Sequence, residues 1–213
     1  MRYLLAQPER VLQLTGQHLQ IVGVAVLVAI LLGIPIGILV TRLRWLEGPV
    51  INTAGVLYTV PSLALFAVLI PFTGLGARPA IVALILYSLL AIIRNTVAGL
   101  DSVPPAMRDA ARGVGMTSWQ RLVFVELPLG LPVILAGVRL ATVAAIGIAT
   151  VAAYVGAGGL GLLIFDGIRV VDGDRIIAGA FSISVLALVA DAALSRLGSA
   201  LRRDVAPALR GGG

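Results

Sequence analysis

The sequence predicts an all-α, polytopic membrane protein, a helical bundle with about five transmembrane helices. Of its 213 residues, 59% are hydrophobic and only 12% are charged, whereas a soluble domain carries about 25% charged residues. So few charges cannot cover a globular surface. Segments of roughly 20 apolar residues span about 30 Å of hydrocarbon. Such segments are expected at residues 21–40, 50–70, 79–97, 132–153 and 176–195.

One membrane domain is expected over residues 21–198, because no linker is long enough to separate two domains. Residues 1–20 are expected to form an amphipathic segment on the membrane surface, with an unstructured leader as the alternative. The only histidine, His18, falls in this segment and is expected at the interface or in a loop. The tail, residues 199–213, carries arginines and ends in glycines, and we expect it to be disordered in the cytoplasm.

The distribution of arginine predicts the orientation of the chain. All 16 basic residues are arginines. With the N-terminus outside and the C-terminus in the cytoplasm, ten arginines fall in cytoplasmic segments and five in outer ones. This bias is the one that the positive-inside rule requires. The net charge of +6 is therefore attributed to the bilayer and its anionic lipid, and no nucleic-acid partner is expected.

The polar segment between the third and fourth spans predicts two short helices. Pro105 suits the first turn of the first helix, where a missing amide hydrogen costs nothing. Thr117 and Gln120 have the spacing of a capping box, which would open the second helix. We expect Leu127-Pro128 to end this second helix and to redirect the chain into the fourth span.

The same segment resembles the EAA loop of ABC-importer permeases, in which acid-Ala-Ala-x3-Gly is followed by a Leu-Pro pair. The matching residues are Asp109, Ala110, Ala111, Gly115, Leu127 and Pro128. The resemblance implies that the loop, residues 101–128, forms a coupling helix that docks into a groove on a cytoplasmic ABC ATPase dimer. These six residues are the ATPase-coupling candidates. Asp109 stands where glutamate is usual in the family, so an acid is retained.

Three segments, residues 58–65, 127–139 and 156–168, resemble permeases for osmoprotectants such as glycine betaine, choline, carnitine or proline-like solutes. The resemblance implies an ABC type-1 transmembrane domain in the cell (plasma or inner) membrane. It also implies a second permease subunit, identical or paralogous, and an extracytoplasmic substrate-binding protein. ATP hydrolysis would lie on a partner, so no catalytic residue and no cofactor is expected here. Methionine-type permeases share the glycine-rich run and the five-span size, and they remain the alternative.

Six residues are candidates for lining the translocation path: Tyr58, Pro61, Tyr87, Tyr154, Gly158 and Gly159. Quaternary ammonium solutes favour aromatic cages, although belt or packing roles are the alternative for the tyrosines. Proline in a membrane helix frees a carbonyl, which fits a helix that lines a cavity. The glycine run 156–161 predicts a tight turn at the outer end, with substrate contact as the alternative. A phosphate-binding loop is excluded, because no Gly-Lys-Ser/Thr follows.

Two charges, Arg139 and Asp191, fall within the predicted spans. A charge in the membrane is a functional candidate by default, and a mutual ion pair is the structural alternative. Neither belongs to an acid or histidine relay, which argues against an ion-driven secondary transporter. A purely structural membrane subunit is a third possibility, which the interrupted spans disfavour. With no cysteine and one histidine, no metal site is expected.

Overall fold

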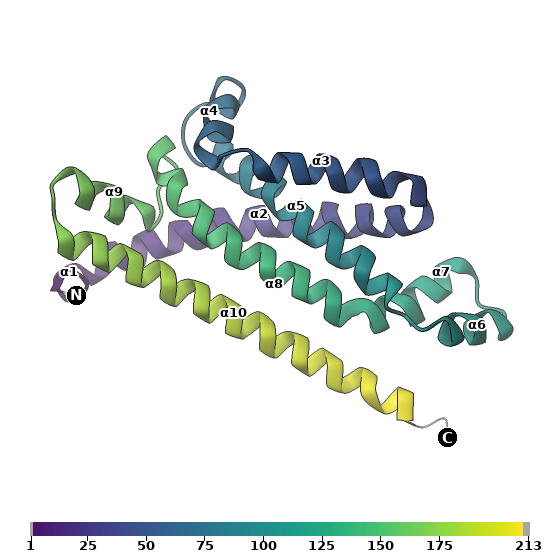
Figure 1. Cartoon of the computed structure of the whole chain (residues 1–213). Helices are drawn as coiled ribbons and strands as arrows, with labels where there is room; N and C mark the ends of the chain where they lie inside the picture. Colours follow the sequence, from purple (N-terminus) through teal and green to yellow (C-terminus); the bar gives the residue numbers. More distant parts are fainter. Residues whose placement is uncertain (1, 211–213) are drawn as a thin grey trace.

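The computed structural model describes the backbone of residues 2–210 and the side chains of residues 2–200. This part of the chain is helical and contains no strand, as predicted (Figure 1). The α-helices are α1 (Arg2–Ala6), α2 (Pro8–Arg42), α3 (Glu47–Thr59), α4 (Ser62–Thr73), α5 (Ala77–Asp101), α6 (Pro105–Gly113), α7 (Ser118–Arg121), α8 (Leu127–Ala152), α9 (Gly161–Arg169) and α10 (Gly173–Arg210). Shorter turns are the 3-10 helices η1 (Arg44–Leu46) and η3 (Ala153–Val155) and the π-helical turn η2 (Leu122–Glu126).

Four helical stretches are long and apolar enough to cross a membrane: α2, α5, α10 and the stretch from α7 to η3. The pair α3 and α4, bent by 99°, makes a fifth span when the two helices are counted as one broken span. The predicted number of spans is therefore confirmed, whereas a single second helix over residues 50–70 is wrong. The cause is Pro61, because the residue before a proline is disfavoured in the helical region. Val60 is accordingly extended, with ψ of 129°.

The first span begins earlier than the sequence predicts. α2 starts at Pro8 and has 35 residues, a length of about 52 Å. Most of residues 1–20, expected on the membrane surface, therefore belongs to this helix. Leu14 is 1% exposed and packs with Leu160 and Leu163. These partners lie far away in the sequence, so the apolar pattern of the first residues alone does not reveal the contact.

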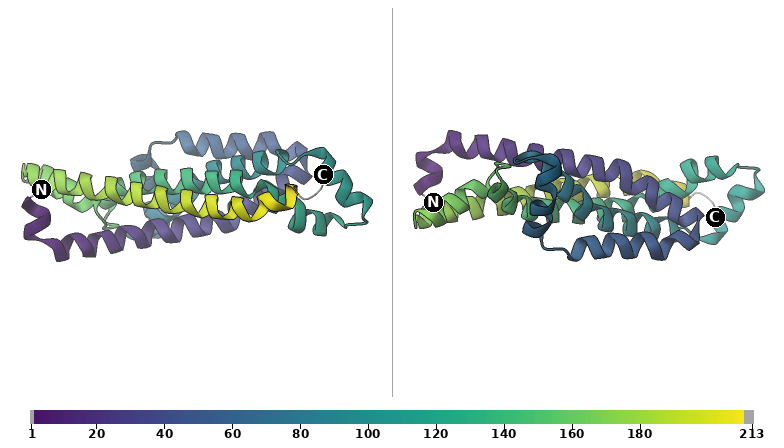
Figure 2. Two further views of the ribbon diagram at one scale, coloured as in Figure 1. Left: turned by 90° about the horizontal axis from the view of Figure 1, so that it is seen from below. Right: turned by 90° about the horizontal axis from the view of Figure 1, so that it is seen from above.

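The two ends of the bundle carry different elements. α6, α7 and the C-terminal end of α10 lie at one end, and α1 and α9 lie at the other (Figures 1 and 2). This is the arrangement that an odd number of crossings requires. α10 continues through Arg210, so the tail expected to be disordered from residue 199 is helical over its described part. Its alanine, leucine and arginine residues favour a helix; residues 211–213 lie outside the described residues.

α5 is the central helix and packs against both α2 and α8. Glycines bring the backbones together on both sides. A Cβ atom at Gly37 of α2 would lie 2.6 Å from Cβ of Thr96 on α5, and one at Gly99 of α5 would lie 2.7 Å from the carbonyl oxygen of Gly130 on α8. A Cβ atom at Gly33, four residues before Gly37, would lie 2.8 Å from Cγ2 of Ile92, so this pair of small residues lets α2 approach α5 closely.

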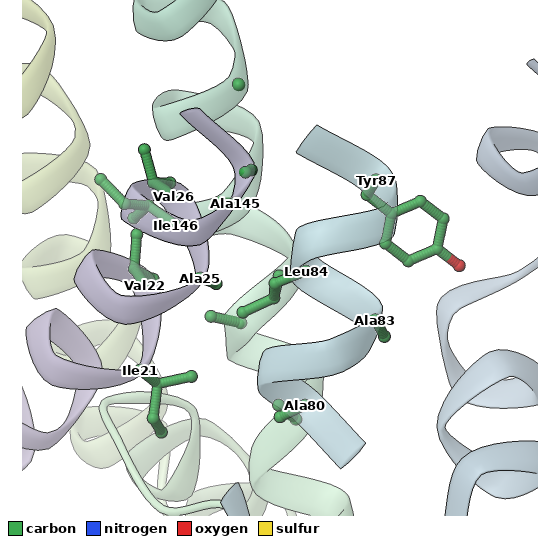
Figure 3. Close-up of a cluster of buried hydrophobic side chains, with 14 of the residues drawn as sticks. Ile21, Val22, Ala25, Val26, Ala80, Ala83, Leu84, Tyr87, Ala145 and Ile146 are labelled. Carbon is green, nitrogen blue, oxygen red and sulfur yellow. The ribbon is translucent and has the colours of Figure 1, made fainter. Parts of the chain in front are cut away.

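The main apolar core lies where α2, α5 and α8 meet (Figure 3). Ala25, Ala83 and Ala145, one from each helix, are at most 2% exposed. Leu84 points from α5 towards α2, whereas Tyr87 points away from α2 (Figure 3). α10 lies along the outside, and only 11% of its most apolar stretch is buried. The fold thus leaves a large apolar surface of α10 to its membrane surroundings.

Candidate coupling and pathway sites

α6 is a short helix bounded by a proline and a glycine. Pro105 occupies its first turn, as predicted. At the other end Gly115 has a left-handed φ of 83°, and the Met116 amide donates to the carbonyl of Ala111 at 3.0 Å. This helix ending favours glycine, because other residues are strained at positive φ. Gly115 therefore sets the direction in which the chain leaves α6.

α7 begins with the predicted capping box. The Gln120 amide donates to Thr117 Oγ1 at 3.2 Å, and the Thr117 amide donates to Gln120 Oε1 at 2.8 Å. Both bonds satisfy amide groups that the first turn of a helix leaves free. The box and the glycine together produce a sharp turn between α6 and α7.

The predicted helix end at Leu127-Pro128 is wrong. Helical backbone runs without a break over Ser118–Val155. Within it, η2 is a π-helical turn, in which the Leu127 amide donates to the carbonyl of Leu122, five residues earlier. A proline in a regular helix clashes with the carbonyl four positions before it. The wider π-helical turn ahead of Pro128 changes this local geometry and lets the helix continue.

The predicted coupling residues of α6 do not share one face. Asp109 and Ala110 are exposed, and Asp109 Oδ1 lies 3.4 Å from Nη1 of Arg112. Ala111, by contrast, is only 5% exposed. Both alanines are coupling candidates from the sequence, and of the two this structure leaves Ala110 open to a partner.

An apolar surface beside α6 was not predicted. Val114, Trp119 and Phe124 are 75%, 71% and 68% exposed. Around them lies a shallow hollow lined by Val114, Gly115, Met116, Gln120 and Phe124. The sequence signal for this surface is a pair of aromatic residues, Trp119 before Gln120 and Phe124 after it, close to a polar turn. Exposed apolar groups at the end of a bundle are typical of a protein contact surface.

Four charged side chains at the base of α6 and α7 form what we call the Glu126 cluster: Glu126, Arg42, Arg108 and Arg121. The Glu126 side chain is only 4% exposed. Its Oε2 accepts a hydrogen bond from Arg42 Nη2 at 2.6 Å, and its Oε1 accepts one from Arg121 Nε at 3.2 Å. Arg108 Nε lies 4.0 Å from Oε1. A buried carboxylate needs such partners, and the sequence did not reveal them, because Arg42 lies 84 positions before Glu126.

Three of the six path candidates meet at the break between α3 and α4. The rings of Tyr58 and Tyr87 pack edge to face, with centroids 5.9 Å apart. The Tyr87 hydroxyl donates to the carbonyl of Val60 at 2.6 Å, directly before Pro61. It thereby satisfies a carbonyl at the helix break. Tyr87 is 5% exposed, whereas Tyr58 is 46% exposed and accessible.

The other path candidates are Tyr154, which lies in η3, and Gly158 and Gly159 in the turn between η3 and α9. Both glycines have left-handed φ angles, 84° and 81°, and the Gly159 amide donates to Gln17 Oε1 of α2 at 3.1 Å. His18 is 1% exposed, with Nε2 3.0 Å from the carbonyl oxygen of Ile146. His18 is therefore a buried residue of α2, and its expected place in a loop is wrong. The glycine run forms the predicted irregular turn, held against α2.

Arg139 of α8 and Asp191 of α10 form the ion pair that the sequence analysis offered as an alternative. Arg139 Nη2 donates to Asp191 Oδ2 at 2.6 Å, and Nε donates to Oδ1. Such a two-point contact is the strong geometry for a guanidinium and a carboxylate. The two side chains remain 44% and 34% exposed, so the pair lies on the surface of this chain.

Membrane-length helices, a break in the second span and a short exposed helix at one end make this chain a multi-span helical membrane protein. The family model "Binding-protein-dependent transport system inner membrane component" matches residues 25–203. The chain belongs to this family and is an inner-membrane transport protein. Membership favours the permease interpretation over an ion-driven transporter or a purely structural subunit.

Curated relatives match nearly the whole chain. The osmoprotectant import permease protein OsmW of Salmonella typhimurium is 50% identical over 200 residues, covering 92% of this chain and 93% of the relative. The carnitine transport permease protein OpuCB of Listeria monocytogenes is 48% identical over 183 residues, covering 86% and 84%. The glycine betaine/carnitine/choline transport system permease protein OpuCD of Bacillus subtilis is 46% identical over 192 residues, covering 90% and 84%.

Solved structures show the same fold. A chain of the MetNI methionine ABC transporter, in an inward-facing conformation, superposes with a TM-score of 0.82 at 21% identity, covering 92% of this chain and 98% of that one. A chain of an amino acid ABC transporter solved with histidines gives a TM-score of 0.72 at 20% identity, covering 94% and 96%. At this identity the likeness concerns the fold alone.

Proposed function

We propose that this chain is the permease subunit of an ATP-driven importer for a compatible solute such as glycine betaine, choline, carnitine or a proline-like osmoprotectant. The observation that carries the proposal is the 40–50% identity to permeases named for these solutes, combined with family membership over residues 25–203. The methionine alternative has weaker support, because the methionine transporter is similar at only 21% identity.

In this proposal α6 is the coupling helix and ATP is hydrolysed on a separate cytoplasmic ATPase dimer. Asp109, Ala110 and Gly115 would face the groove of the ATPase, and the exposed apolar side chains of Val114 and Phe124 would border it. The supporting feature is position, because α6 lies at the end of the bundle where α10 also ends (Figure 1). Leu127 and Pro128 stand at the start of α8, where they would carry the motion into the membrane.

A second permease subunit would complete the translocation path, and a substrate-binding protein would deliver the solute at the opposite end. The second subunit is either identical or paralogous. The large exposed apolar surface of α10 and the exposed ring of Tyr58 are available for such an assembly. Tyr58 is the path candidate best placed to meet a quaternary ammonium group, because an exposed aromatic face attracts such cations. Tyr87 and Pro61 would hold Tyr58 in place.

The test of coupling exploits the lack of cysteine in the sequence. A photoreactive maleimide attached to the variant Ala110→Cys is activated in membranes that contain the ATPase encoded with this protein. We expect a crosslink to the ATPase whose yield changes when ATP is added. The matched control is Ala111→Cys, which the structure buries and which should label poorly. Exposure of Ala110→Cys only to reagents added from outside would overturn the orientation and the coupling role together.

The test of substrate class is uptake into proteoliposomes that contain the complete importer. ATP-dependent uptake of radiolabelled glycine betaine, choline or carnitine is the expected result. Uptake of methionine alone would overturn the proposed solute class while leaving the permease role intact.

A further inference from the structure

The Glu126 cluster stands out because one buried carboxylate serves three guanidinium groups. Arg42 is the last residue of α2, Arg108 belongs to α6, and Arg121 ends α7. Glu126 itself is the last residue of η2, immediately before α8. One carboxylate therefore connects α2 and α6 to the continuous helix that contains α7, η2 and α8.

Apolar packing does little to hold α6 in place. Among the described residues of α6 only Ala111 is buried, and α7 has no buried residue. Polar contacts of Arg108 also attach α6 to the bundle. Arg108 faces Glu126 and also donates through Nη2 to the carbonyl of Leu100, in the last turn of α5. A movement of α6 would therefore reach α5 and the Glu126 carboxylate through Arg108.

The backbone at the cluster departs from a regular α-helix. η2 is a π-helical turn, and such turns occur frequently at functional sites. Its final residue carries the carboxylate, so a displacement of the arginines acts directly on the turn from which α8 begins. A packed element with two discrete arrangements is what couples distant sites physically.

We propose that Glu126 is a positioning residue that transmits the movement of α6 to α2 and α8 through its arginine partners. This inference rests on the proposed function, in which α6 docks on the ATPase. Arg42 links the carboxylate to α2, Arg121 fixes the start of the α7–α8 helix, and Arg108 joins both to α6. Removing the charge at Glu126 would separate these elements mechanically while leaving the docking surface of α6 intact.

The experiment compares the complete importer carrying Glu126→Gln with the wild-type importer in proteoliposomes. ATP hydrolysis and solute uptake are measured in the same vesicles, and the readout is solute imported per ATP hydrolysed. We expect this ratio to fall about tenfold, within the usual range of coupling between sites, while basal hydrolysis is retained. A residue that only supports the fold would lower both activities together and leave the ratio unchanged.

The matched control is Glu47→Gln, which removes an exposed carboxylate paired with Arg44 at 3.2 Å and should leave the ratio unchanged. A second variant, Arg42→Gln, removes only the link to α2 from a side chain that is 38% exposed. It should assemble normally and also lower the ratio. An unchanged ratio in both cluster variants would overturn the proposal, and so would failure of both to assemble with the ATPase.

The photocrosslink from Ala110→Cys separates this inference from the proposed function. If the otherwise unmodified chain gives no crosslink to the ATPase, the docking role fails, and the Glu126 proposal fails with it. If the crosslink forms with and without Glu126→Gln and the transport ratio is unchanged, only the role of Glu126 is overturned.

Discussion

The Glu126 cluster and the Arg139–Asp191 pair hold charge in opposite ways. Glu126 is 4% exposed and faces three arginines from three helices. Arg139 and Asp191 match one to one, join only α8 and α10, and remain 44% and 34% exposed. Other parts of the chain bury the Glu126 carboxylate, whereas the Arg139–Asp191 pair is partly exposed on the surface of the chain.

This difference separates two roles for charge in a membrane protein. The cluster contains three arginines and one carboxylate, so its electrostatic energy depends on how the arginines are placed around Glu126. The Arg139–Asp191 pair is electrically balanced, but it projects from helices of membrane length, where charge facing lipid is costly. We therefore expect the open side of the pair to meet protein or water in the assembled importer, and not acyl chains.

The largest effect on stability is expected from breaking the balanced pair. Asp191→Asn leaves Arg139 as an uncompensated charge on a membrane helix. The purified subunit should lose more thermal stability than with Arg121→Gln, measured as the fraction that stays monodisperse after heating in detergent.

The double variant Arg139→Gln with Asp191→Asn should regain most of the loss, because removing both partners leaves no unpaired charge. A double variant as unstable as Asp191→Asn would contradict the balanced-pair interpretation.

An intermediate effect is expected from Arg121, whose side chain is 11% exposed. Arg121→Gln removes a charged hydrogen bond to Glu126, and such bonds contribute about 1.5–3 kcal/mol. The two other arginines remain to neutralise the carboxylate, so the loss should be smaller than for Asp191→Asn. Denaturation of the purified subunit measures it, and a loss as large as that of Asp191→Asn would show that the three arginines do not share the charge.

The smallest effect is expected from the exposed pair on α6. Asp109 and Arg112 are 69% and 62% exposed at their side chains, and exposed ion pairs contribute less than about 1 kcal/mol. Asp109→Asn should therefore leave the stability of the isolated subunit almost unchanged at any salt concentration. Its effect should appear only in the complete importer, as a weaker photocrosslink from Ala110→Cys. A clear loss of stability in the isolated subunit would assign Asp109 to the fold instead of to docking.

The sequence predicted the features that depend on local composition and spacing. The number of spans, the start of α6 at Pro105 and the capping box of α7 all follow from apolar runs and from residues a few positions apart. Val60 and Pro61 contained the signal for the broken second span, but an apolar run does not specify the direction of the helix. The continuation of the helix through Pro128 depends on a π-helical turn, for which no simple sequence pattern exists.

The features that escaped prediction depend on distant contacts. Leu14 and His18 look like part of a surface segment until α8 and α9 cover them. In the sequence Glu126 belongs to the short second helix of the polar segment, and only the fold brings Arg42 of α2 to it. Ala111 matches the coupling pattern as well as Ala110 does, and only the fold turns one inward and leaves the other exposed.

The close contacts of α5 also bear on which changes the chain tolerates over evolution. Glycines of α2 and α8 face α5 on both sides, and the absence of their side chains lets α5 lie close to both helices. Exchanges among leucine, isoleucine and valine on the outer face of α10 should have little effect on the stability of the fold. A single methyl group added at Gly37 or Gly99 would separate two helices along their length. We expect the glycines beside α5 to change far more slowly among relatives than the apolar surface that makes up most of the protein.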